Sequence, residues 1–328
     1  MQVMLFDTAI STSNQGDEII YEDVKKGLDP ILHNAMIFRM GTHIVNYSSY
    51  QLIRKEDVKI KRICDGADYK FVCGTNLIAD NLKGVNPQWM VNPVNARLYK
   101  DSILVGVGRK SDYKSPNYYT KKIYDQILSK EYAHSVRDED TKKVLEDMGF
   151  KAINTGCPTL WGFNKEKCEA IPVKKADKVV FTVSGFFYQR NPEADKKMIE
   201  VLRRNYSELY FWAQAVRDEE YCREITDMND IKVIYSLEKY KEILNDGNID
   251  YVGTRLHGGV FAMQNDCRAL VIAIDQRARG FHRDNNISIL ERDQIDELED
   301  IINSDIITNI QVDNVAINEF INQFEHTL

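Results

Sequence analysis

The chain has 328 residues, of which 43% are hydrophobic and 28% charged, and its formal net charge is −7 at pH 7. This length suits two domains, and the proportions are those of an ordinary soluble protein. The acidic balance without a basic stripe argues against a nucleic-acid-binding protein.

The longest apolar runs, such as residues 269–274, are strand-sized and far shorter than the roughly 20 residues that span a bilayer. The first residues also lack the basic start and long apolar stretch of a signal peptide. We therefore expect a cytoplasmic protein without a transmembrane segment, and peripheral contact with a membrane is left open. The six cysteines have no metal-ligand spacing, so we expect neither a metal site nor a disulfide framework.

In the first half of the chain, short β-branched or aromatic runs alternate with stretches of helical period, as expected for a parallel sheet. The expected strands are 2–10, 69–75, 102–108 and 133–138. The expected helices are 17–29, 117–129 and 139–148. The pattern leaves residues 31–68 undivided.

A second alternating series follows residues 156–177, whose composition is typical of a linker. Its expected strands are 178–184, 208–214, 232–236, 250–255 and 269–275. Its expected helices are 192–205, 217–227, 237–246 and 258–265. The pattern predicts an α/β protein with two Rossmann-like, doubly wound domains facing a cleft. The predicted domains are 1–165 and 166–290, followed by a helical tail at 291–328 that packs on the first domain or stands apart.

Ligands of open parallel sheets bind where strands end and helices begin, so these corners are the candidate sites. At the first corner, Asn14, Gly16 and Asp17 open a helix whose free backbone N–H groups favour an anion or polar substrate. The simpler alternative is that Asn14 or Asp17 caps this helix. The lysine and the spacing of a Walker loop are absent.

The corners after the next strands carry weaker signals. Gly74 allows a close backbone approach, and Thr75 and Asn76 offer polar groups, although a plain turn explains them equally well. Arg109 and Lys110 follow another strand, where a solvated basic loop is the simpler interpretation.

Two further corners lie between a strand and a helix, one near the end of the first domain and one at the start of the second. Arg137 and Asp138 end a strand, and Asp138 is also a natural N-cap. Ser184 and Gly185 could bind a ligand through hydroxyl and backbone. The aromatic residues 186–188 could stack on a sugar ring, although packing is the commoner role of such residues.

The strongest corner is Thr-Arg-Leu-His-Gly-Gly at 254–259. Arg255 offers a fork of donors for phosphate or carboxylate, and His257 donates when protonated. Gly258 and Gly259 would expose N–H groups at the start of a helix whose dipole favours an anion. Arg277 follows the next strand and could add positive charge, with a surface loop as the alternative.

Four motifs occur in order along the chain: "NQGDEII" from residue 14, "CGTNLIADN", "VRDEDTKKVLEDMGF" followed by "NTGCPTL", and "DYVGTRLHGGVFAMQNDCRALVIAID" ending at residue 275. This order resembles the polysaccharide pyruvyl transferase family. The resemblance implies a GT-B-like fold of two Rossmann-like domains facing a cleft. It also implies transfer of the enolpyruvyl group of phosphoenolpyruvate to a sugar of a cell-surface polysaccharide, usually as a pyruvate ketal. The sequence departs from the family pattern at Gly74-Thr75, where Gly-Gly is usual, and at Gly259, a second glycine after the histidine.

The resemblance also implies roles for individual residues. Arg255 and His257 would hold the donor, and His257 would also be the acid. Asp17 is the first candidate for the base or the acceptor-orienting group, and Asp138 is the second. Arg137 would reach across to the donor. The other candidate substrate-binding residues are Gly258, Gly259, Asn14, Gly16, Gly74, Thr75, Asn76, Ser184 and Arg277.

The expected partners are a small-molecule donor, bound by the second domain, and a saccharide acceptor, bound by the first. No metal or cofactor is needed beyond phosphoenolpyruvate as the donor substrate. Two alternatives are a GT-B-type glycosyltransferase that uses a sugar nucleotide and a non-catalytic glycan-binding protein. The acceptor sugar and the oligomeric state are left open.

Overall fold

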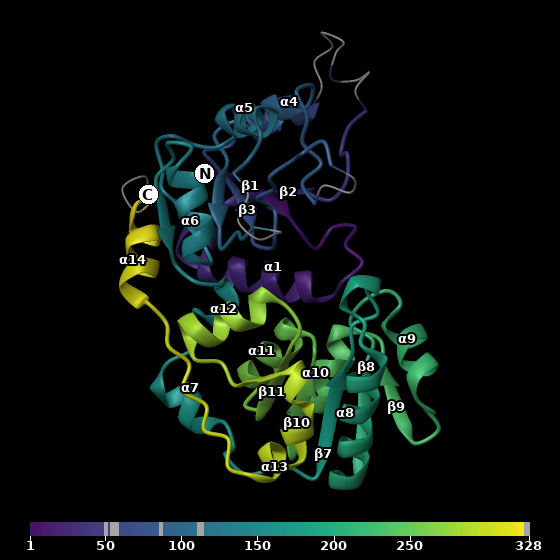
Figure 1. Cartoon of the computed structure of the whole chain (residues 1–328). Helices are drawn as coiled ribbons and strands as arrows, with labels where there is room; N and C mark the ends of the chain where they lie inside the picture. Colours follow the sequence, from purple (N-terminus) through teal and green to yellow (C-terminus); the bar gives the residue numbers. More distant parts are fainter. Residues whose placement is uncertain (49–51, 53–58, 85–87, 110–114, 325–328) are drawn as a thin grey trace. The chain divides into compact units, whose positions relative to one another are not determined.

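A computed structural model describes residues 1–48, 52, 59–84, 88–109 and 115–324 (Figure 1). The chain divides into two compact units. The first unit comprises Met1–Thr12, Ile20–Trp161 and Asp313–Leu328, and the second comprises Ser13–Ile19 and Gly162–Val312. These units differ from the predicted domains mainly in two ways. Residues 13–19 belong to the second unit, and the predicted tail from residue 291 is divided between the second unit and the first.

The first unit contains a parallel sheet in the order β2-β1-β3-β4. Its strands are β1 (Gln2–Asp7), β2 (Met36–Gly41), β3 (Tyr69–Cys73) and β4 (Ile103–Val105). A parallel pair, β5 (His134–Val136) and β6 (Ala152–Asn154), adjoins β4 through a bridge between Val107 and Val136. The four predicted strands are confirmed but shorter, whereas β2 and β6 were not predicted. The order changes direction between β1 and β3, which places the switch point of this sheet there.

The three helices predicted in the first unit are confirmed as α1, α5 and α6. The helices described in this unit are α1 (Gly16–Gly27, whose first turn lies in the second unit), α2 (Asp29–Leu32), α4 (Lys59–Asp65), η1 (Ala96–Tyr99), α5 (Tyr118–Ile127), α6 (Glu139–Glu146), η2 (Pro158–Leu160) and α14 (Asn314–Asn322). The last of these belongs to the predicted tail, and Gln323 beside it exchanges two hydrogen bonds with the backbone of Ala133. Of the tail, therefore, only the part from residue 313 packs on the first unit, and residues 325–328 lie outside the described residues.

The second unit contains six parallel strands in the order β12-β11-β10-β7-β8-β9. They are β7 (Lys178–Thr182), β8 (Glu208–Trp212), β9 (Ile231–Ile234), β10 (Ile249–Gly253), β11 (Ala269–Ala273) and β12 (Ile289–Glu291). The five predicted strands are confirmed, and β12 is an addition. This is the order of a doubly wound Rossmann fold, with its switch point between β7 and β10. The α/β prediction with doubly wound sheets is thus confirmed.

The helices of the second unit cover both faces of this sheet. They are α7 (Lys165–Ala170), η3 (Phe187–Gln189), α8 (Pro192–Asn205), α9 (Asp218–Ile225), α10 (Leu237–Asn245), α11 (Leu256–Gln264), α12 (Gln276–Asn285), η4 (Arg292–Glu297) and α13 (Leu298–Asn303). One core packs α8, α9 and α13 against the sheet, and α10 and α11 pack on the opposite face. The four predicted helices are confirmed. Part of the predicted linker forms α7, and the loop expected at Arg277 is instead α12.

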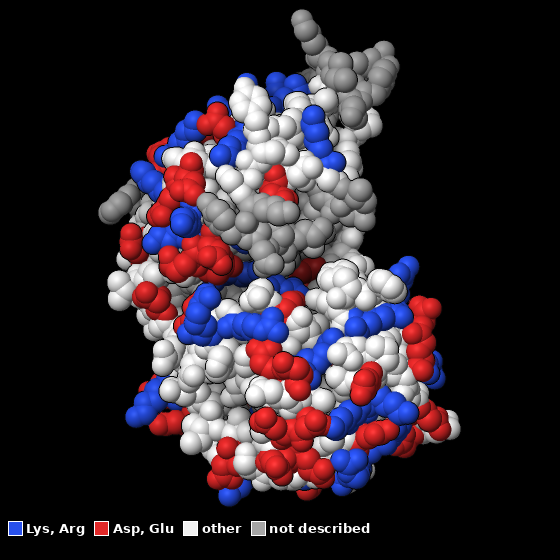
Figure 2. All heavy atoms as spheres, in the orientation of Figure 1, with Lys and Arg blue, Asp and Glu red and all other residues white. Residues whose placement is uncertain are grey.

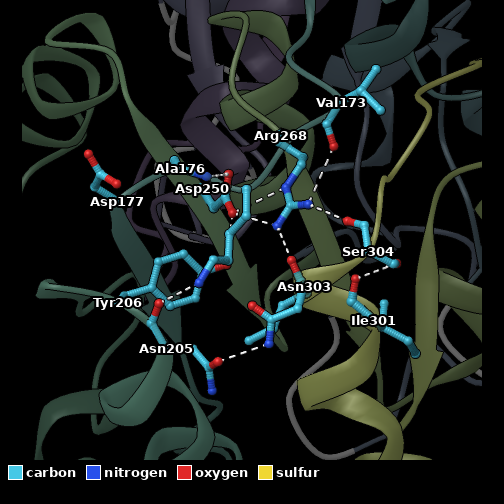
Figure 3. Close-up of polar contacts among 12 residues, drawn as sticks. Val173, Ala176, Asp177, Asn205, Tyr206, Asp250, Arg268, Ile301, Asn303 and Ser304 are labelled. Atoms are coloured by element: carbon cyan, nitrogen blue, oxygen red, sulfur yellow. Dashed lines mark hydrogen bonds and ion pairs between the residues drawn. The ribbon is translucent and has the colours of Figure 1, made fainter.

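A buried ion pair lies at the amino ends of β10 and β11 (Figure 3). Two nitrogens of Arg268 donate to Oδ2 of Asp250 at 3.1 and 2.7 Å. The same guanidinium donates to the carbonyls of Ile302 and Ser304, and Tyr206 donates to Asp250. The network fastens the segment after α13 to the sheet, at the edge opposite the carboxyl ends where ligands bind.

The face shown in Figure 2 carries interspersed acidic and basic side chains over the second unit. None of the helices in the described part of the chain combines the length and apolar character needed to cross a membrane.

Candidate functional site

The switch point of the second unit is a tightly built corner at the ends of β7 and β10. Gly253 approaches the backbone of Thr182 so closely that a Cβ on Gly253 would lie 2.6 Å from the Thr182 nitrogen. The Thr182 hydroxyl accepts from the amide of Arg255 at 3.1 Å and shares a hydrogen bond with Tyr251, which donates to the Arg255 carbonyl. These contacts fix the backbone that enters α11.

Helix α11 begins at this corner with Arg255 as its N-cap residue, whose side chain makes no capping hydrogen bond. Such an end offers backbone N–H groups and the positive end of the helix dipole to a ligand. The Gly259 amide, predicted to be exposed, instead donates to the Arg255 carbonyl at 3.2 Å because the helix begins three residues before Gly259. Gly258 and Gly259 also have a packing role that the sequence did not reveal. A Cβ on Gly258 would lie 3.0 Å from Gln214, and one on Gly259 would lie 2.8 Å from Val271.

The guanidinium of Arg255 is 6% exposed and pairs with the fully buried Asp218. Nε donates to Oδ2 at 3.1 Å, and Nη2 donates to Oδ1. Asp218 also accepts from the amides of Gly185 and Ala215 at 2.8 and 2.9 Å. Burial raises the pKa of Asp218, and the guanidinium and these amides oppose that effect. Arg255 therefore joins the loops after β7 and β8 to the start of α11, a role the sequence did not predict.

The Asn-x-Gly-Asp corner lies in the second unit and contacts Gln214, which follows β8. Oδ1 of Asn14 accepts from the Gly16 amide at 3.1 Å and from Nε2 of Gln214 at 2.7 Å. Because an amide N–H can only donate, these bonds fix which end of each side-chain amide is oxygen. Oε1 of Gln214 must then face Gly258, where it is buried without a hydrogen-bond partner among the described residues.

Gln214 thus brings together the two motifs that the sequence placed about 240 residues apart. The backbone supports this contact, since Gln15 donates to the Gln214 carbonyl and Val216 donates to the carbonyl of Ser13. The sequence offered one unused signal: Gln214 ends a predicted strand, at the edge where ligands bind.

Ser184 and Arg277 belong to a second polar chain at the same edge. Ser184 donates to Oε1 of Gln189 at 2.6 Å, and Gln189 donates to Asp275 at 3.2 Å. Asp275 pairs with Arg277 through two bonds of 2.9 and 2.6 Å. Burial lowers the pKa of Arg277, but Asp275 and also Asp17 act electrostatically in the opposite direction, and the net shift is upward. The loop predicted here is a helix because Asp275 caps it by accepting from the amides of residues 277 and 278.

His257 and Asp17 are both buried in the second unit, at 5% and 8% exposure. His257 is the second residue of α11, and its ring meets Phe281 of α12 edge to face with centroids 6.0 Å apart. Asp17 lies in the first turn of α1. Both side chains therefore sit in first turns of helices, one of which starts at the switch point.

The remaining candidates lie in the first unit. Gly74 and Thr75 have φ of +69° and +57°, and a Cβ on Gly74 would lie 2.2 Å from Ile20. Asn76 follows them, and its Oδ1 is buried without a hydrogen-bond partner among the described residues. This corner follows β3 at the switch point of its own sheet, which suits a polar ligand. Lys110 lies outside the described residues.

Asp138 caps α6, as its alternative interpretation held. Its carboxylate accepts from the amide and hydroxyl of Thr141 at 2.7 and 2.6 Å. Arg137 is buried and lies 3.4 Å from Asp138 through Nε. Gly108 makes room for it, because a Cβ there would lie 2.3 Å from that nitrogen. Among the described residues of both units, no group of His, Cys, Asp and Glu is arranged to hold a metal.

Comparison with known proteins gives both a family and a fold. Residues 14–276 match the family described as polysaccharide pyruvyl transferase. The structure of S. aureus MnaA with UDP is similar over 100% of this chain and 96% of that chain, with 10% identity and a TM-score of 0.54. A glycosyltransferase from Rickettsia africae is similar over 99% of this chain and 92% of that chain, with 12% identity and a TM-score of 0.50. No curated protein matches the sequence.

Proposed function

The chain belongs to the polysaccharide pyruvyl transferase family and is a transferase with a GT-B-like fold, and on this premise we propose which group it transfers. It moves the enolpyruvyl group of phosphoenolpyruvate to a sugar of a cell-surface polysaccharide, such as an exopolysaccharide, or to its precursor, and forms a pyruvate ketal. One observation carries the proposal: the two corners that define the family likeness meet through Gln214 at the switch point of the second unit. A cytoplasmic location is part of the same proposal.

The donor carries a phosphate and a carboxylate, so its site must hold two anionic groups. The uncapped start of α11 supplies backbone N–H groups for one of them. Arg277 is also paired with a carboxylate, that of Asp275, but its side chain is 35% exposed, so its permanent positive charge stays accessible to a ligand in the same unit. Arg255 acts mainly by holding the α11 corner in place, because its fork is already bound to Asp218.

The reaction needs an acid and a base. A proton adds to the methylene carbon of phosphoenolpyruvate, a sugar oxygen bonds to the adjacent carbon, and the hydroxyl proton goes to the base. A second sugar oxygen then bonds to that carbon as its bond to the phosphate oxygen breaks, and the second hydroxyl proton leaves with the phosphate. We assign the first protonation to His257 and the base to Asp17. Asp138 is the second candidate for the base, and its capping role in α6 weighs against it.

A sugar-nucleotide glycosyltransferase is the second candidate function, because MnaA of the same fold was solved with UDP. Thermal unfolding with phosphoenolpyruvate, UDP or GDP separates the two, since a ligand stabilises the folded state that binds it. We expect phosphoenolpyruvate to raise the Tm and the nucleotides to leave it unchanged. A rise with a nucleotide alone would favour the glycosyltransferase. No rise with any of the three, and no transfer, would favour a non-catalytic glycan-binding protein.

A further inference from the structure

Two aromatic side chains stand out at the carboxyl edge of the second sheet. Phe187 and Tyr188 follow β7 and are 86% and 82% exposed. Val216 after β8 and Tyr235 after β9 are also exposed, so four of the five exposed large apolar side chains described in this unit lie at this edge. Exposed apolar groups gathered at a ligand-binding edge indicate a binding surface.

The segment that carries the two aromatic rings is held firmly. Gln189 donates from its backbone to Phe186, and its side chain bonds Ser184 and Asp275. Arg292 donates to the Gln189 carbonyl at 2.7 Å. The exposure of Phe187 and Tyr188 is therefore a fixed feature of the fold, and a rigid aromatic surface loses little entropy when it binds.

The neighbours of these rings connect them to the candidate donor site. Phe186 lies under the guanidinium of Arg255, whose Cζ is 4.7 Å from the ring centroid. The ring of Tyr188 is parallel to that of Phe186, at an interplanar angle of 4° and a centroid separation of 6.1 Å. Tyr188 also contributes to the raised pKa of Arg277. The ring of Phe186 therefore connects Tyr188 to the guanidinium of Arg255.

We propose that Phe187 and Tyr188 form a stacking surface for the pyranose ring of the saccharide acceptor. A pyranose has an apolar C–H face that packs on an aromatic ring and a rim of hydroxyls that stays in water, which matches an exposed pair of rings. The inference rests on the proposed function, which supplies the acceptor class, and it brings the acceptor to the second unit, where the sequence predicted only the donor. Because Phe186 connects Tyr188 to the Arg255 corner, a sugar on this surface would lie at the same edge of the sheet as the anionic donor.

Saturation-transfer NMR tests the surface without requiring turnover. The probes are the methyl pyranosides of glucose, galactose and N-acetylglucosamine, with UDP as the competing ligand class. We expect ring C–H protons of at least one pyranoside to be saturated with the wild type. The double variant Phe187→Ala/Tyr188→Ala should weaken binding about tenfold. Tyr188→Phe should bind as the wild type does, because the ring is retained.

Tyr118→Ala is the matched control, since Tyr118 is 73% exposed and lies on α5 of the first unit. It should leave pyranoside binding unchanged, and the unfolding temperatures of all variants should agree because the substituted side chains are exposed. Equal saturation transfer with the wild type and the double variant would overturn the proposal. So would transfer to the uracil protons of UDP without transfer to any pyranoside. Phosphate release from phosphoenolpyruvate, assayed separately on the wild type, shows whether the proposed function itself fails.

Discussion

At the scale of single residues, Gln214 packs against a glycine in each of the two family corners. Its amide lies between Gly16 and Gly258, and a Cβ at either glycine would come within 2.7 or 3.0 Å of its atoms. The arrangement depends on one side chain that bonds Asn14 on one side and faces α11 on the other. Substitutions at the glycines and at Gln214 should therefore be energetically coupled.

Gly16→Ala should reduce both activity and stability because its methyl group meets Nε2 of Gln214. Gln214→Ala should remove that clash, so that the double variant is less impaired than the sum of the single ones, by about 0.5–3 kcal/mol. Urea unfolding of the four proteins measures this coupling. Gly280→Ala is the control, since outside its own helix no atom of the described residues lies within 4 Å of a Cβ there. Strict additivity of the two substitutions would contradict the arrangement.

Asp218→Asn should destabilise the fold by about 3–5 kcal/mol, because it leaves the charge of Arg255 buried without its partner. The measurement is the free energy of unfolding at neutral pH. Asp230→Asn is the control, because Asp230 pairs with Arg203 at a side-chain exposure of 54% and should change stability by less than about 1 kcal/mol. Similar small losses for both variants would show that Arg255 does not depend on Asp218.

At the scale of helices and strands, α12 shows where the sequence pattern was uninformative. Only Ala278 and Phe281 of its ten residues are buried, so it lacks the apolar periodicity that marks a helix. Its signal was the N-cap at Asp275. The strands β2, β6 and β12 were missed for a related reason, since most of their residues are exposed or half-buried and form no continuous apolar run. The strands β7, β10 and β11 were predicted because both of their faces are covered.

Asp275 should make the second unit sensitive to acid. Burial raises its pKa, but Arg277 and the α12 amides outweigh burial and lower it. A lowered folded pKa gives stability that is present above the unfolded value of about 3.9 and is lost as pH falls through the folded value. Unfolding measured from about pH 7 to about pH 3 should therefore show a smaller acid loss in Asp275→Asn, which keeps the cap. An equal loss of stability at low pH in the wild type and in Asp275→Asn would contradict this role.

The sequence predicted those residues of the candidate site that are close together in the chain. Arg255, His257, Gly258 and Gly259 were identified because they stand together in the sequence. Their partners were not, because Asp218 is 37 residues from Arg255 and becomes its neighbour only through the strand order β10-β7-β8. Gln214 and Gln189 escaped notice for the same reason. The roles predicted for Asp138 and Arg137 stay predictions, and Asp138 does cap a helix.

At the scale of the whole molecule, the second unit has buried ion pairs at both ends of its sheet, with Arg255–Asp218 at the ligand edge and Asp250–Arg268 at the opposite edge. In the second unit, the Asp250–Arg268 network lies at the amino ends of the strands, whereas the candidate site lies at the carboxyl ends. Substitutions in the Asp250–Arg268 network should therefore change stability without changing ligand binding.

Asp250→Asn should cost about 3–5 kcal/mol of stability, because Arg268 is 2% exposed and loses the charge of its carboxylate partner. The KM for the donor should stay unchanged in the fraction that remains folded. Asp305→Asn is the control, because Asp305 forms an exposed ion pair with Lys174. This substitution should have little effect on stability. A large change in KM for the donor in Asp250→Asn would contradict the separation of the two edges.

The most direct test of the central claim is phosphate release from phosphoenolpyruvate in the presence of a saccharide acceptor. The wild type should release phosphate and add to the acceptor the mass of pyruvic acid less one water. His257→Ala should still fold but lose at least about a hundredfold in rate, as expected when a general acid is removed. The exposed His33 of the first unit provides the control His33→Ala, which should be fully active. Full turnover by His257→Ala would contradict the assignment of the acid, and no phosphate release by the wild type with any acceptor would contradict pyruvyl transfer itself.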